Sequence, residues 1–120
     1  MYIKDIKWLD EINREAIVII TNDKIEIECF SHPLEKNKND IINNIYCINV
    51  ENVCISTKDE YKINYNEESM KYIISGKLKN RETGIITFED LEMDISESYI
   101  PIDIKEGEFI CFNASRLDIW

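Results

Sequence analysis

The chain has 120 residues, of which 44% are hydrophobic, and it carries a formal net charge of −10. The apolar content excludes a wholly disordered chain, and the length predicts a single domain over residues 1–120 with its own core. Nucleic-acid binding is disfavoured, because phosphate backbones repel an acidic surface. The N-terminal stretch MYIKDIKWLD lacks the apolar centre of a signal peptide, and no apolar run reaches the roughly 18 residues of a membrane span. We therefore expect a cytoplasmic protein with no membrane contact.

The first predicted elements are a strand over residues 2–9 and a β-hairpin over residues 14–31. Asn22 and Asp23 tolerate the positive φ angles of tight turns, so we expect a two-residue loop there. In that register one face of the hairpin is wholly apolar, and it pairs Ile20 with Ile25, Val18 with Ile27, and Ala16 with Cys29. A shift by one residue would turn glutamates into the core, so the apolar face is expected to point inward.

The opposite face of the predicted hairpin mixes isoleucine with glutamate, with Ile19 beside Glu26 and Ile17 beside Glu28. Isoleucines on a solvent-facing side suggest that another element or a partner covers it. We call these four residues (Ile17, Ile19, Glu26 and Glu28) the hairpin face, and they are the candidate partner-binding residues.

The rest of the chain also reads as short strands. Pro33 ends the pairing of the hairpin, and residues 34–44 predict a surface loop, with one helical turn after Asp40 as an alternative. Alternating apolar residues predict strands over residues 46–55, 61–65, 71–79, 85–95 and 109–120, with breaks at 51–52 and 89–90. Gly76 inside a strand indicates a bend or a close backbone approach. About eight strand segments and little helix predict an all-β fold, either a small antiparallel barrel or a sandwich.

Three segments within residues 71–120 support the barrel. KYIISGKL, GIITFEDLEMDI and IPIDIKEGEFICF resemble the last three strands of an OB-fold barrel. The resemblance implies a small OB-like β-barrel and covers less than half of the chain. It implies no site residues, because folds of this kind carry many functions.

Residues that could perform catalysis or bind a metal form no known signature. His32 is the only histidine, and no nucleophile pattern accompanies it, so no enzyme class is supported. Cys29 and His32 have the C-x-x-H spacing of zinc ligands, but no second close pair completes the site. No metal and no cofactor is therefore expected. The four cysteines, Cys29, Cys47, Cys54 and Cys111, are expected to be reduced and mostly buried.

Two hypotheses for a non-enzymatic function follow, and an enzyme ranks third behind them. In the first, the protein is a binding module whose acidic hairpin face engages a basic protein, as small acidic bacterial inhibitor or immunity proteins do. In the second, a barrel holds a small molecule or sugar at its mouth, stacked on Tyr61, Tyr65, Tyr72 or Trp8. Aromatic residues at strand spacing are more often core residues, so the binding module ranks first.

Overall fold

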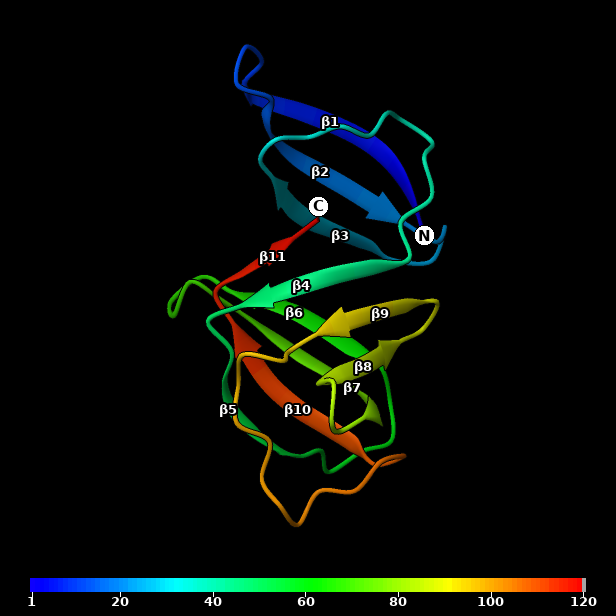
Figure 1. Cartoon of the computed structure of the whole chain (residues 1–120), viewed down its shortest axis with the longest axis vertical. Coiled ribbons are helices and arrows are strands. Elements are labelled where there is room, and N and C mark those ends of the chain that lie inside the picture. The colour runs from blue at the N-terminus through cyan, green and yellow to red at the C-terminus, as the bar shows by residue number, and fades with distance from the viewer. Residues whose placement is uncertain (120) are drawn as a thin grey trace.

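The computed structural model describes residues 1–119, which form eleven β-strands and no helix (Figure 1). The predicted all-β fold is confirmed, although the chain divides into more strands than its sequence pattern indicates. In chain order the strands are β1 (Tyr2–Asp10), β2 (Glu15–Thr21), β3 (Glu26–Ser31), β4 (Asn44–Ile48), β5 (Glu51–Ile55), β6 (Lys62–Asn66), β7 (Lys71–Asn80), β8 (Ile85–Phe88), β9 (Leu91–Asp94), β10 (Phe109–Ala114) and β11 (Arg116–Asp118). Within the described chain, no helix is long and apolar enough to cross a membrane.

All the strands belong to one mixed sheet, with neighbours in the order β1-β2-β3-β11-β4-β9-β8-β7-β10-β5 and β6 paired with β7 beside this path. Two pairs, β11 with β3 and β4 with β9, are parallel. The expectation of a purely antiparallel sheet was therefore wrong. Parallel neighbours need long connections, and here the paired strands lie far apart in the sequence. The alternation of apolar and polar residues shows which face of a strand is buried, but it does not show which strands pair with it.

The predicted barrel is corrected to an open sheet, since no closed barrel is found among residues 1–119 and the path ends at β1 and β5. Within this order, β4 and β5 are the two ends of the run β4-β9-β8-β7-β10-β5. In the sequence, however, they are consecutive strands, separated only by Asn49 and Val50. This run curls around the lower half of Figure 1, and β1–β3 form a second curved layer above it. Positive φ angles at Asn49 and Asn52 (54° and 58°) bend the chain there, and β4 and β5 do not pair.

The β2–β3 hairpin forms, but its register differs by two residues from the predicted one. The observed pairs are Ile20 with Ile27, Val18 with Cys29, and Ala16 with Ser31. Side chains alternate with a period of two, so a shift of two leaves each residue on its expected face. Val18, Ile20 and Ile27 are buried as predicted, whereas Ile25 lies in the turn and is only partly buried.

Side-chain hydrogen bonds explain the wider turn of this hairpin. The side-chain oxygen of Asn22 accepts hydrogen bonds from the backbone N–H groups of Lys24 and Ile25, at 3.0 and 3.1 Å. The hydroxyl of Thr21 donates to the carbonyl of Ile25 at 2.6 Å and accepts from the N–H of Asp23 at 3.0 Å. These side-chain bonds stabilise a four-residue loop over residues 22–25. A two-residue turn would not require them.

The N-terminal layer departs from the sequence pattern in two places. A register shift in β1 between Ile3 and Asp5 places both Ile3 and Ile6 opposite buried residues of β2, whereas strict alternation would put them on opposite faces. The segment 34–44 contains no helix, and it is not a simple surface loop, because Leu34 and Ile42 are buried in the core.

The strands β7, β8 and β9 follow their predicted pattern, whereas the strand predicted over residues 109–120 divides at Ser115 into β10 and β11. Ile74, Leu78 and Met93 are fully buried on the inner face of β7 and β9. Gly76 makes the close backbone approach that its position indicates, because a Cβ atom there would lie 2.8 Å from the carbonyl oxygen of Thr87. The core thus takes side chains from both layers, and the molecule extends over 46 × 26 × 26 Å.

Candidate functional site: a cleft beside the β2–β3 hairpin

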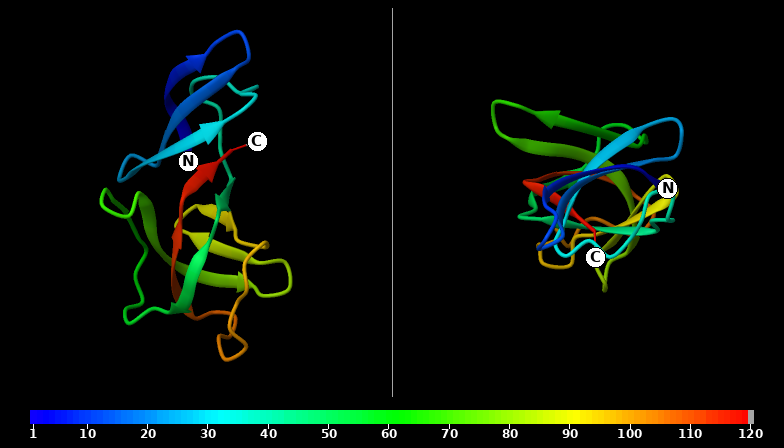
Figure 2. Two further views of the ribbon diagram at one scale, coloured as in Figure 1. Left: turned by 90° about the vertical axis from the view of Figure 1, so that its left-hand side faces the viewer. Right: turned by 90° about the horizontal axis from the view of Figure 1, so that it is seen from above.

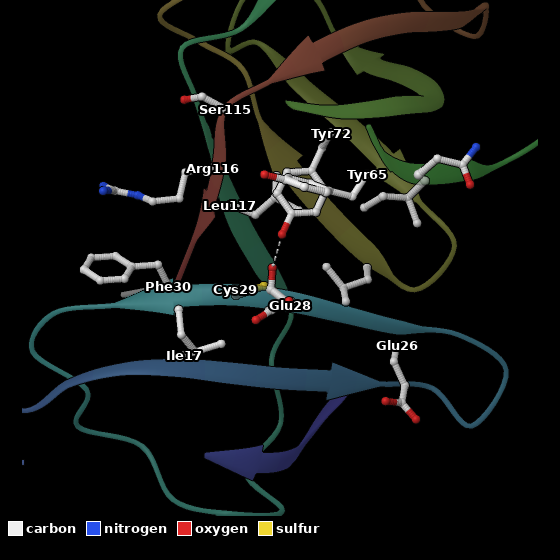
Figure 3. Close-up of a pocket in the computed structure, with 13 residues that line it drawn as sticks. Ile17, Glu26, Glu28, Cys29, Phe30, Tyr65, Tyr72, Ser115, Arg116 and Leu117 are labelled. Atoms are coloured by element: carbon white, nitrogen blue, oxygen red, sulfur yellow. Dashed lines mark hydrogen bonds between the residues drawn. The ribbon is translucent and has the colours of Figure 1, made fainter. Parts of the chain in front are cut away.

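A cleft with a volume of about 560 Å³ lies between the β2–β3 hairpin, the β6–β7 hairpin and β11 (Figure 3). It exists because β3 and β11 pair at a single position, Phe30 with Asp118, and diverge from there. The views in Figure 2 show the β6–β7 hairpin projecting beside β3. A space bounded by three elements is thus left open next to the hairpin face.

The side of the cleft formed by the β2–β3 hairpin combines acidic and apolar side chains. Glu26 and Glu28 are exposed, and Ile17 and Phe30 are half-buried beside them. The carboxylate of Glu26 forms an ion pair with Lys4 at 2.5 Å. Glu28 has no ion-pair partner among residues 1–119, so its negative charge faces the cleft without compensation.

Arg116 is the cation that lines the cleft, and its charge is already matched. Its guanidinium donates two hydrogen bonds of 2.7 Å to the carboxylate of Asp118, which is 6% exposed. The guanidinium also lies over the ring of Phe30, 4.4 Å from its centroid. The hydrogen bonds to Asp118 raise the pKa of Arg116, so the pair stays charged and internally neutral. The cleft therefore keeps a negative character.

Tyr72 reaches across the cleft from β7 to β3. Its hydroxyl donates a hydrogen bond of 3.3 Å to the backbone carbonyl of Glu28, as Figure 3 shows. Its ring meets Tyr65 edge-on, with the centroids 4.9 Å apart. Partial burial, and then the nearby Glu28 carboxylate, raise the pKa of Tyr72 to about 12. The hydroxyl is therefore protonated, and able to donate, throughout the neutral range.

The four hairpin-face residues lie on the same side of the hairpin, and three of them line the cleft. Ile17, Glu26 and Glu28 do so, whereas Ile19, which pairs with Glu28, is half-buried and does not line it. Sequence reasoning missed Phe30, although it alternates with Glu26 and Glu28 on the same strand face and could have been found from that spacing.

Two other cleft residues differ in how far the sequence could reveal them. Tyr72 was a stacking candidate, but the sequence gives no sign of its bond to β3. Arg116 carries no sequence signal, because its partners come from β11 and from the distant β3.

The remaining aromatic candidates lie elsewhere. Tyr61 packs against Phe88 and Phe109, with centroid distances of 5.6 and 5.2 Å. Trp8 lies under the guanidinium of Arg14, 4.8 Å from its ring centroid. Neither Tyr61 nor Trp8 lines the cleft, so Tyr65 and Tyr72 are the two stacking candidates that do.

The cysteines and the histidine do not converge. Cys29 and Cys47 are buried, Cys111 is half-buried and Cys54 is exposed, so fewer of them are buried than expected. Burial raises the pKa of Cys29 and of Cys47, which keeps both as thiols. His32 is exposed, and within the described part of the chain no three His, Cys, Asp or Glu side chains are placed to hold a metal ion.

Comparison of the chain with models of known families, with curated proteins and with solved structures finds no match. The cleft is therefore interpreted from its own geometry and charge.

Proposed function

We propose that this protein is a non-enzymatic binding module that engages a basic protein through the cleft and the hairpin face. The observation that carries the proposal is the uncompensated Glu28 carboxylate beside apolar Ile17 and Phe30, in a cleft whose cation, Arg116, is neutralised by Asp118. Apolar contacts at such a site supply affinity, and the carboxylates select a cationic partner.

The charge of the whole chain supports the same partner class. A net charge of −10 steers cationic proteins towards the molecule and repels nucleic acids. Enzymes that act on nucleic acids present cationic surfaces, so inhibition of, or immunity to, such an enzyme is the concrete form of the proposal. A cytoplasmic setting, which keeps cysteines reduced, belongs to the same proposal.

The test reverses charge at the cleft and measures association. The double variant Glu26→Lys/Glu28→Lys should bind the basic partner recovered by the wild-type protein with an association rate about tenfold lower at low salt. The control variant Glu97→Lys/Asp103→Lys changes the net charge equally at exposed positions outside the cleft. It should retain most of the wild-type rate. Equal rates for the wild type and the cleft variant would refute the proposal.

A second candidate function is the binding of a sugar or another small molecule on Tyr65 and Tyr72. The cleft volume of about 560 Å³ suits such a ligand, and both tyrosines line it. It ranks second because the two rings already contact each other edge-on. NMR titration with a sugar panel tests it, since binding here would shift the signals of these two rings first. The OB-like character of residues 71–120 stays a prediction.

A further inference from the structure

One edge of β3 is open along most of the strand. β3 pairs with β2 over its whole length, but on its other side it meets β11 only at Phe30. The carbonyl of Phe30 accepts a hydrogen bond of 2.9 Å from the N–H of Ile119 on that side. Backbone groups of alternate residues in a strand point the same way, so those of Glu28 and Glu26 also point into the cleft. The bond from Tyr72 to the Glu28 carbonyl agrees with this direction.

We propose that the partner inserts an extended basic segment into the cleft as an additional β-strand along β3. The inference rests on the proposed function and specifies how the partner binds. Open strand edges recruit extended peptides, because the peptide backbone supplies the missing ladder hydrogen bonds. The described chain places no strand along Glu26–Cys29 on this side, where the cleft separates β3 from the β6–β7 hairpin.

The side chains of β3 specify the pattern of the inserted segment. Glu26 and Glu28 face outward, while Ile27 and Cys29 face the core. A neighbouring strand sets its alternate side chains opposite the two glutamates, where lysine or arginine forms favourable cross-strand pairs. The intervening side chains meet apolar residues that also line the cleft, including Ile63 and Leu117. The expected segment therefore alternates basic and apolar residues.

Tyr72 competes with the inserted strand, because both use the carbonyl of Glu28 as an acceptor. An incoming backbone N–H replaces a single hydrogen bond between uncharged groups. Removing the competing hydroxyl with Tyr72→Phe should therefore raise the affinity for a suitable peptide by about two- to tenfold. A loss of affinity in this variant would contradict the shared acceptor.

The decisive experiment uses a fluorescent synthetic peptide in which lysine alternates with valine, with fluorescence anisotropy as the readout. Two modified forms carry N-methyl groups on all lysine amides or on all valine amides, which block opposite edges of an extended strand. One form should bind at least about tenfold more weakly than the unmodified peptide, and the other within about twofold. Loss on lysine methylation indicates an antiparallel strand, and loss on valine methylation a parallel one.

The outcomes separate the inference from the proposed function. Equal binding by both methylated forms, or no binding by the unmodified peptide, would overturn strand insertion. The association rates of the charge-reversed proteins then still decide the proposed function. A peptide in which glutamate replaces lysine serves as the charge control. If it bound as tightly as the lysine peptide, selection for a basic partner would be refuted even with the strand geometry intact.

Discussion

Glu28 presents two different groups to the same cleft. Its carboxylate is exposed and has no ion pair among residues 1–119, and its backbone carbonyl accepts the hydroxyl of Tyr72. Substitution can therefore separate the two contributions, since Glu28→Lys changes the charge and Tyr72→Phe changes the access to the carbonyl. At the scale of single residues, the candidate site is a charged side chain and a backbone acceptor on the same strand, β3.

Replacing Tyr72 by Phe should make stability less sensitive to alkaline pH. The pKa of Tyr72 is raised from 10.0 to about 12, mainly by partial burial and secondarily by Glu28. Folding therefore favours the protonated hydroxyl, and the stability that it contributes is complete below pH 10.0 and is lost as the pH rises towards about 12. Urea unfolding across this range should show a shallower decline for Tyr72→Phe than for the wild type. Parallel declines would show that Tyr72 does not titrate as described.

At the scale of elements, the hairpin shows which features of a strand are local. Alternation identified the buried face of β2 and β3 correctly, because a side chain's face depends only on its position in the strand. The register depends on hydrogen bonds that the Thr21 hydroxyl donates and the Asn22 side-chain oxygen accepts, and the alternation pattern does not contain their geometry. The parallel pairing of β3 with β11 depended on residues remote in the chain.

The candidate site was predictable to the same extent. Glu26 and Glu28 could be assigned to an outward face from spacing alone. The cleft beside them arises where β3 and β11 diverge, and Tyr72 reaches it from β7. These relations are tertiary, so no local pattern encodes them.

The observed register predicts unequal effects for two isoleucines of the hairpin. Ile27 is 2% exposed, so Ile27→Ala should lower the free energy of unfolding by about 2–5 kcal/mol. Ile25 lies in the four-residue turn and is only partly buried, so Ile25→Ala should have a clearly smaller effect. Denaturant unfolding of both variants measures the difference. Equal losses would favour a two-residue turn, in which both side chains point into the core.

At the scale of the whole molecule, the net charge determines which class of partner we expect. With a net charge of −10 the surface gains nothing from the release of counterions, so we expect no measurable affinity for single- or double-stranded oligonucleotides at physiological salt. Filter binding or anisotropy with labelled oligonucleotides checks this. Retention that falls steeply with salt would contradict the acidic-module proposal. Association with a basic protein should instead slow down as salt screens the steering field.

The position of β11 has a consequence for how the protein folds. β11 lies between β3 and β4 in the sheet, yet in the chain it comes after every other strand. During synthesis β1–β3 therefore emerge long before the strand that joins them to the rest of the sheet. Contacts between such distant segments close large loops and slow folding. Until β11 forms, the one position where it meets β3, Phe30, is unpaired as well, so the entire outer edge of the nascent β3 is open to backbone pairing before folding is complete.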